Sequence, residues 1–248
     1  MKRKENRQND EIREVKFIVD YLEHPLSSCL METGGTKVLC SVFHENKVPA
    51  FLKGNGMGWI TAEYGMLPGS TTKRTVRERT YGKIYGRNQE IQRLIGRALR
   101  AMIDLKKVGE LTFYIDCDVI QADGGTRTAS INAGAVALAL AVKKLMFKSF
   151  FIKNPLIQTV SAISVGIVKG EKIIDLNFEE DSIADIDMNI VESGEDKIIE
   201  IQGTGERDFF SLKDLNELVL LSRKGISEIR TLQNEAIENG YEKFIKKS

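Results

Sequence analysis

The start of the chain alternates between hydrophobic and polar positions. Residues 15–19, 28–32 and 37–44 follow this two-residue period, which is typical of strands with one buried face. Gly34 and Gly35 separate the last two segments and predict a hairpin turn between them. The chain is therefore expected to open with three strands, two of them joined by a tight turn.

Residues 88–107 carry the clearest helical pattern. Apolar side chains recur there at steps of three and four, which is the spacing of a stripe on the buried face of a helix. They are Ile91, Leu94, Ile95, Ala98, Leu99, Met102 and Ile103. Asn88 is expected to cap the start of this helix, and Gly109 follows its expected end.

Before this helix, residues 51–79 are interrupted by glycine and proline and end in a basic polar stretch. The interrupting residues are Gly54, Gly56, Gly58, Gly65, Pro68 and Gly69. Loops of such length are usually functional or disordered. We therefore expect a long irregular connection here.

The rest of the chain repeats an order of strand and then helix. Residues 111–121 predict a strand and residues 128–144 a helix of small apolar residues. One face of that strand is apolar, with Phe113, Ile115, Cys117 and Val119. Later strands are expected near residues 160–168, 172–176, 187–191 and 197–202, before a C-terminal helix from Ser211. This order predicts two βαβ-like halves packed as one α+β domain.

Charge is segregated along the chain, although the net charge of +1 indicates no particular partner. Residues 70–107 hold 11 Lys/Arg against 3 Asp/Glu, whereas residues 171–208 hold 13 acids against 3 bases. Such a distribution can pair a phosphate-binding region with a cation-binding one. The alternative is that both segments are solvated faces of helices and loops.

Several classes of protein are excluded by what the sequence lacks. Its cysteines and histidines are too few and too scattered for a zinc site and fit a reducing compartment. They are Cys29, Cys40, Cys117, His24 and His44. No apolar run follows the charged residues 1–10 as a signal peptide would, and the longest, residues 133–142, is shorter than the roughly 20 residues that span a bilayer. We expect a cytoplasmic protein with no membrane partner.

The segment QADGGTRTAS, residues 121–130, is the first candidate for chemistry. Glycines allow backbone N–H groups to approach an anion, and a helix that starts at or just after Arg127 adds unsatisfied donors. The guanidinium of Arg127 suits phosphate. The segment lacks the Gly-Lys-Ser/Thr of a Walker A loop. The alternative is a tight turn with an arginine on the surface.

Two further candidates have the same ambiguity when taken alone. Arg87 precedes the expected start of the first long helix, so it and Arg127 would form one anion pocket if the two helix ends are adjacent. Asp181 and Asp187, in an acidic turn, are suitable oxygen ligands for a divalent cation. An ordinary surface arginine and a solvated acidic loop are the alternatives.

The same segments resemble those of the ribonuclease PH family. IDCDVIQADGGTRTASI (residues 115–131) is similar to the most specific signature of that family nearly letter for letter, and residues 90–110 resemble its first long helix. Further similar stretches, in the family's order, are FLKGNGMGWITAEYGMLP (51–68), SVGIVKGE (164–171), DMNIV (187–191) and EIQGTGE (200–206). The resemblance extends over nearly the whole chain.

The resemblance implies an α+β fold, an α/β sandwich like the second domain of ribosomal protein S5, as a single domain over residues 1–248. It implies a homohexameric ring, built as a trimer of dimers. It also implies a phosphorolytic 3′→5′ exoribonuclease that trims transfer RNA precursors with inorganic phosphate and releases nucleoside 5′-diphosphates. The reverse reaction adds nucleotides to 3′ ends.

The resemblance further assigns roles to individual residues. It places the phosphate-binding arginine on Arg87 and the phosphate loop on Gly125, Thr126 and Arg127. It places the two metal-associated aspartates on Asp181 and Asp187, which implies Mg²⁺ or Mn²⁺ as cofactor. Arg127 and the two aspartates are the expected catalytic residues, with Asp181 either a metal ligand or the general acid to the departing 3′ oxygen.

The basic loop before the first helix has two possible uses. Lys73, Arg74, Arg77 and Arg79 would grip the RNA backbone in a salt-sensitive manner, or would form a contact surface within the ring. The chain departs from the family at the opening Arg3 to Arg7, at Gly69 and at Asn88, which concerns RNA gripping and assembly more than the reaction.

Two other classes of protein compete with the enzyme. A non-catalytic ring subunit that only binds RNA would lack the phosphate arginines or the aspartates, and this chain has all of them. A small-molecule kinase of the same fold would need a nucleotide-binding glycine loop, which the sequence lacks. We therefore expect an enzyme.

Overall fold

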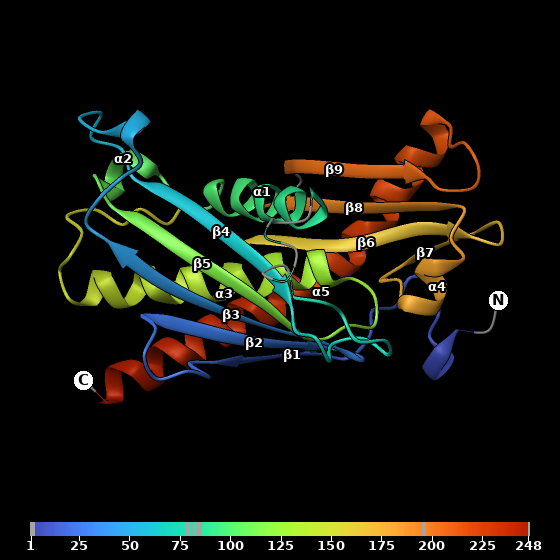
Figure 1. Ribbon diagram of the computed structural model, residues 1–248, viewed down its shortest axis with the longest axis horizontal. Coiled ribbons are helices and arrows are strands. Elements are labelled where there is room, and N and C mark those ends of the chain that lie inside the picture. Colours follow the sequence, from blue (N-terminus) through green and yellow to red (C-terminus); the bar gives the residue numbers. More distant parts are fainter. Residues whose placement is uncertain (1–2, 78–79, 81, 83–85, 195–196, 248) are drawn as a thin grey trace.

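Two β-sheets and two long helices make up most of the protein (Figure 1). A computed structural model describes residues 3–77, 80, 82, 86–194 and 197–247. The first sheet has the strand order β1-β2-β3-β5-β4. Its strands are β1 (Val15–Val19), β2 (Ser27–Thr33), β3 (Thr36–Glu45), β4 (Trp59–Met66) and β5 (Thr112–Gln121). The α+β class is confirmed.

The predicted N-terminal strands and their hairpin are confirmed, since β2 pairs antiparallel with β3 around Gly34 and Gly35. The long irregular connection is wrong in part, because it contains β4. In β4, Ile60, Ala62 and Tyr64 alternate into the core. Glycines at both ends obscured this alternation. A short 3-10 helix, Ala50–Leu52, precedes the strand.

The first long helix, α1 (Gly86–Arg100), begins and ends earlier than predicted. Asn88 lies inside it rather than at its cap. The chain turns after Arg100 and forms a separate short helix, α2 (Leu105–Val108), which Gly109 ends. Helix α1 connects β4 to β5, which are parallel, so this part of the first half is a β–α–β unit.

The second sheet is wholly antiparallel, in the order β7-β6-β8-β9. Its strands are β6 (Val160–Val168), β7 (Glu171–Ile174), β8 (Ile186–Ser193) and β9 (Lys197–Gly205). The acidic turn is more ordered than predicted, because it contains the helix α4 (Phe178–Ser182). Asn177 caps α4 and Glu180 completes its capping box. The C-terminal helix α5 (Leu212–Lys247) follows β9.

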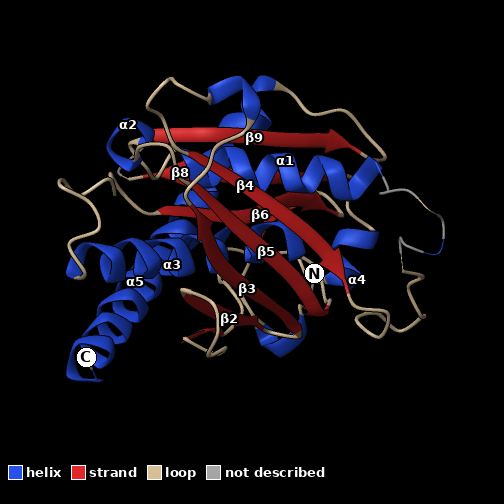
Figure 2. Cartoon of the chain, turned by 60° about the vertical axis from the view of Figure 1, so that its left-hand side comes forward, coloured by secondary structure: helices blue, strands red, loops and turns tan. Residues whose placement is uncertain are grey.

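Helix α3 (Thr126–Phe147) lies at the centre of the molecule and packs on β2, β3 and β6 as well as on α5 (Figure 2). It is apolar on all sides, as expected of a helix enclosed by protein. Of the described helices, α3 alone has the length and hydropathy of a membrane span, but 83% of its most apolar window is buried inside the protein. It is therefore the core helix of this fold.

A polar contact joins α3 to the second sheet. The buried Asn132 donates to the carbonyl of Ala162 and accepts from the amide of the same residue, both at 2.8 Å. Its carboxamide thus satisfies both backbone groups of one residue of β6, which would otherwise be buried without partners. Gln233 of α5 donates to the carbonyls of Asn132 and Val160. These bonds fix how the two sheets sit around α3.

Candidate active site

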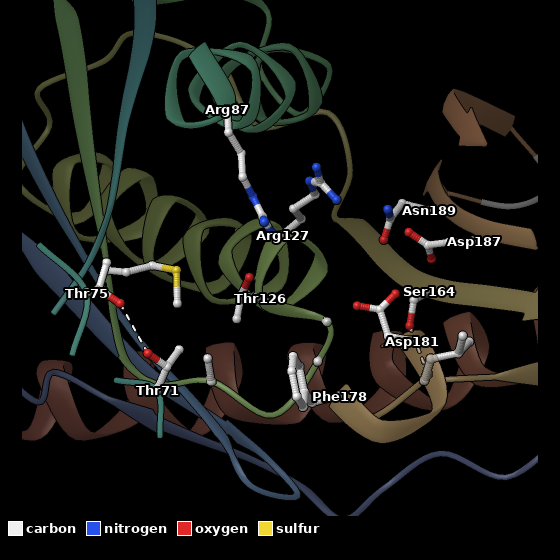
Figure 3. A pocket seen from close by; sticks show the side chains of 15 residues that line it. Thr71, Thr75, Arg87, Thr126, Arg127, Ser164, Phe178, Asp181, Asp187 and Asn189 are labelled. Atoms are coloured by element: carbon white, nitrogen blue, oxygen red, sulfur yellow. Dashed lines mark hydrogen bonds between the residues drawn. The ribbon is translucent and has the colours of Figure 1, made fainter. Parts of the chain in front are cut away.

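A cavity of about 260 Å³ opens where the two halves of the chain meet. It is lined by the turn between β5 and α3, the first residues of α1 and α3, and residues of β6, α4 and β8 (Figure 3). A second cavity of about 380 Å³ shares four of these residues, Arg87, Arg127, Asp181 and Asp187. The four charged residues predicted from the sequence therefore surround one site.

The two predicted phosphate-binding arginines converge at this site. Arg87 lies in the first turn of α1, and Arg127 is the second residue of α3. Figure 3 shows both side chains extending into the same space from their separate helices. The first turn of a helix exposes unpaired N–H groups and the positive end of the helix dipole. Both arginines thus stand where an anion is favoured.

Neither guanidinium is neutralised by an ion pair. Among the described residues, neither lies in direct contact with a carboxylate, although both act on the charge of Asp181, and the buried Nε of Arg127 has no hydrogen-bond partner. A buried donor without a partner costs free energy comparable to a lost hydrogen bond. A bound phosphate would remove that cost.

The predicted Gly-Thr-Arg loop and the two residues before it are held in place by three short contacts. Thr36 of β3 donates to the carbonyl of Gly124 at 2.7 Å and accepts from the amide of Asp123 at 2.8 Å. The hydroxyl of Thr126 lies 3.0 Å from that of Tyr64 in β4. A Thr126 hydroxyl that accepts from Tyr64 keeps its own O–H to donate, so Thr126 can offer an anion both its hydroxyl and its backbone amide.

Gly124 joins the phosphate loop to the acidic segment. Its φ is +76°, and a Cβ there would lie 2.5 Å from the carbonyl oxygen of Leu176. The main chain therefore passes directly against the connection between β7 and α4. The Phe178 amide, at the start of α4, donates to the carboxylate of Asp123 at 3.3 Å. This close approach brings the acidic segment to the loop.

Asp181 and Asp187 form the opposite wall, from α4 and β8 (Figure 3). Burial, and then the charge of Asp181, raise the pKa of Asp187 to about 6. Loss of hydration also raises the pKa of Asp181, although its side chain reaches the surface, and Arg127 and Arg87 partly offset this rise. Two carboxylates that repel each other in a partly buried site are expected to bind a cation.

The fit of a divalent cation can be judged from these donors. No group of three or more His, Cys, Asp and Glu that could hold a metal exists in the part of the chain that the structure describes. Two carboxylates are nonetheless sufficient for Mg²⁺, which usually keeps several waters and shares phosphate oxygens with its substrate. The site therefore fits a metal held jointly by the protein and the phosphate ligands.

Sequence reasoning missed several residues of the site. Ser164, Phe178 and Asn189 line the first cavity, and Glu206 and Arg207 line the second. Asn189 is only 5% exposed, and it lies two residues after Asp187, so both side chains are on one face of β8. Ser164, Asn189 and Glu206 fall inside stretches that resemble the ribonuclease PH family, which was the available signal.

The basic loop is placed only in part. Lys73, Arg74 and Arg77 are exposed and do not line either cavity. Arg79 lies outside the described residues. Thr71 and Thr75, at the start of the loop, do line the first cavity, and their hydroxyls are 3.1 Å apart. The loop thus touches the first cavity through its threonines, and its described basic residues lie outside that cavity.

Two cationic helix starts that face two carboxylates define a site for phosphoryl transfer, in which positioning and charge do most of the work.

Comparison with family models leads to the same class of protein. The model of the 3′ exoribonuclease family, domain 1, matches residues 11–144, and that of its domain 2 matches residues 158–225. The ribonuclease PH of Bacillus subtilis (strain 168) is 53% identical over 236 residues, covering 95% of this chain and 96% of that protein. The ribonuclease PH of Neisseria meningitidis serogroup B is 52% identical over 232 residues, with coverage of 94% and 96%.

The chain belongs to the ribonuclease PH family of 3′ exoribonucleases. The predicted activity, a phosphate-dependent 3′→5′ exoribonuclease and nucleotidyltransferase of transfer RNA processing, is thereby confirmed.

Solved structures support the fold. Rice (Oryza sativa) Rrp46 superposes with a TM-score of 0.76 at 19% identity, covering 95% of this chain and all of that one. A chain of the Archaeoglobus fulgidus exosome with RNA bound to its active site superposes with the same score at 22% identity, covering 93% and 92%.

Proposed function

We propose that Arg87, Arg127 and the amides of residues 125–127 hold inorganic phosphate in line with the last phosphodiester bond of an RNA. The observation that carries this proposal is the pair of unneutralised arginines at two helix starts, across the cavity from two carboxylates. Orthophosphate is repelled by the RNA backbone unless its charge is offset. Fixed cations and amides offset it without reorganisation during the reaction.

The bond changes follow from this placement. An oxygen of the bound phosphate attacks the phosphorus of the terminal phosphodiester, and the bond from that phosphorus to the 3′ oxygen of the preceding nucleotide breaks. The departing 3′ oxygen takes a proton, and a nucleoside 5′-diphosphate is released. Positioning of this kind supplies several kcal/mol of barrier reduction.

Asp181 and Asp187 would hold Mg²⁺ or Mn²⁺, which would offset the charge that develops on the transferring phosphoryl group. The alternative role for Asp181, in place of holding the metal, is general acid to the departing 3′ oxygen. The raised pKa of Asp181 supports this role, because a carboxyl that keeps its proton longer is a better acid near neutral pH.

The larger assembly is also proposed. RNA, in the form of transfer RNA precursors with 3′ extensions, is the expected partner, and Lys73, Arg74, Arg77 and Arg79 would contact its backbone. The Archaeoglobus fulgidus exosome, which was solved with RNA bound to its active site, supports RNA binding on this fold. The resemblance to the ribonuclease PH family further implies a cytoplasmic homohexamer built as a trimer of dimers. The packing of α3 against both sheets supports a single domain over residues 1–248.

The reaction type can be tested with one assay. The protein is incubated with an RNA bearing a single-stranded 3′ tail, with and without phosphate, in the presence of Mg²⁺. We expect nucleoside 5′-diphosphates only when phosphate is present. Nucleoside monophosphates, formed equally without phosphate, would indicate hydrolysis and refute the proposed role of the arginines.

A further inference from the structure

The cavity has apolar lining residues that phosphate chemistry does not use. Besides the charged Arg87, Arg127, Asp181 and Asp187, it is lined by Phe178, Met66 and Leu176. Phosphate groups and a metal have no use for aromatic and aliphatic side chains. A ligand that fills the whole cavity therefore has a charged part and an uncharged part.

Phe178 is exposed to an unusual degree for an aromatic residue in a pocket. Phe178 is 60% exposed, although burying a phenylalanine ring stabilises a protein. The main chain of Phe178 is well fixed, because it follows the helix cap Asn177 and its amide is bonded to Asp123. A rigidly placed but uncovered ring is available to a ligand.

The ring is also correctly placed relative to the reacting groups. Phe178 and Asp181 are three residues apart in α4, so their side chains lie on one face of the helix. Figure 3 shows the ring below Thr126 and beside Asp181, at the edge of the phosphate loop. A terminal nucleotide whose phosphodiester lies in line with the phosphate on the arginines would thus extend its base toward Phe178.

We propose that Phe178 is a stacking platform for the base of the 3′-terminal nucleotide. This proposal rests on the proposed function, since it names a further group of the substrate that occupies the same cavity. Every base has a π face, so stacking on an aromatic side chain tolerates any sequence. Such a platform suits an enzyme that must accept each successive nucleotide of an RNA end.

The first test compares kinetic constants of Phe178→Ala with those of the wild type. Stacking is worth about 1–3 kcal/mol per base, so KM for the RNA, and KM for a nucleoside diphosphate in the reverse reaction, should rise about 5- to 150-fold. KM for inorganic phosphate should stay within about twofold. The increase should be similar for tails ending in any of the four bases. An unchanged KM for RNA, or an equal rise in KM for phosphate, would overturn the proposal.

Matched variants separate stacking from other effects. Phe178→Tyr and Phe178→Trp should restore the KM for RNA, whereas Phe178→Leu, which keeps an apolar side chain without a ring, should not. Phe209→Ala is the control, because Phe209 is 98% exposed and lies outside both cavities. If Phe178→Ala instead changes the oligomeric state measured by light scattering, the ring is an assembly contact and the proposal is wrong.

A binding measurement keeps this proposal distinct from the reaction. Trp59 is the one tryptophan of the sequence, so Trp59→Phe combined with Phe178→Trp gives a single reporter at the site. Adenosine and uridine 5′-diphosphate should both quench its fluorescence, and ribose 5-phosphate should not. Quenching in a protein that fails the phosphorolysis assay would refute the proposed function but keep the platform. An active protein without quenching would refute the stacking platform and leave the proposed function in place.

Discussion

Two neighbouring groups of arginines differ in how their charge is balanced. The N-terminal arginine cluster (Arg3, Arg7 and Arg13) is buried and paired. Arg3 donates to Glu180 at 2.8 and 3.1 Å, and Arg13 donates to Asp175 at 2.9 and 2.6 Å. The site arginines, Arg87 and Arg127, form no ion pair within the described part of the chain. The paired arginines of the N-terminal cluster hold the acidic segment in place. The charge of the two site arginines is available to a ligand.

The same contrast separates two adjacent acids. Burial alone would raise the pKa of Glu180, but hydrogen bonds from Arg3 and the Asn177 amide lower it. The pKa of the next residue, Asp181, is raised by loss of hydration. Glu180 points to the N-terminal arginine cluster and Asp181 to the cavity. One turn of α4 thus carries a carboxylate paired inside the fold beside one that lines the candidate site.

Removing a site arginine should have the largest effect. Arg127→Ala is expected to lower kcat/KM for phosphorolysis by about 10³- to 10⁵-fold, the range for arginines that stabilise a transferring phosphoryl group. Thermal unfolding should stay near that of the wild type. Arg93→Ala, on an exposed position of α1, is the control. Near-normal turnover of Arg127→Ala at saturating phosphate would show that Arg127 does not anchor phosphate.

Removing a paired arginine should instead destabilise the fold. Arg13→Met leaves Asp175 buried without its main partner, which costs about 3–5 kcal/mol in the free energy of unfolding by urea. Arg13 lowers the pKa of the buried Asp175 against the effect of burial. A lowered pKa contributes stability above the unfolded value and loses it as pH falls through the folded value.

The difference between Arg13→Met and the wild type should therefore shrink in acid. Lys224→Met, which breaks the exposed pair with Asp10, is the control and should lower the free energy of unfolding far less, because solvent screens that pair. Equal losses in the two variants would contradict the structural role of the cluster.

Protons should compete with the divalent cation at the acidic wall. Because the pKa of Asp187 is about 6 without metal, the Kd for Mg²⁺ should rise about tenfold for each pH unit below that value. Above pH 7 it should be nearly constant. Titration calorimetry at pH 5, 6 and 7.5 measures this. Asp187→Asn should bind weakly at all three values, and a wild-type Kd independent of pH would exclude Asp187 as a ligand.

The smallest effect is expected at the rim. Replacing Lys73, Arg74 and Arg77 together by alanine should weaken RNA binding and lower its salt slope by about 2, since each contact with a single strand contributes roughly 0.7. KM for phosphate should not change. Lys106→Ala, in the same basic segment, is the control. Loss of the oligomer with an unchanged salt slope would assign the loop to ring contacts instead.

The sequence alone predicted those parts of the fold that depend on local patterns. Strands with a two-residue period and the glycine turn after β5 follow from side-chain alternation and backbone freedom, which act over a few residues. The end of α1 could not be predicted from such local patterns. Met102 and Ile103 keep the apolar spacing although the helix ends at Arg100, because both are buried beyond the turn and Ile103 pairs with Leu156. The apolar side chains thus stay buried beyond the end of the helix, so their spacing did not mark where the helix ends.

The family and the identity of the charged site residues were also determined by the sequence, through motifs that lie close together in the chain. Their convergence was decided only in three dimensions. Arg87 and Asp187 meet because α3 packs against both sheets and Asn132 fixes it to β6. The raised pKa of Asp187 and the uncovered ring of Phe178 depend on which groups surround them. Solvation and contact distances between distant segments have no local pattern in a sequence, so only the folded chain specifies them.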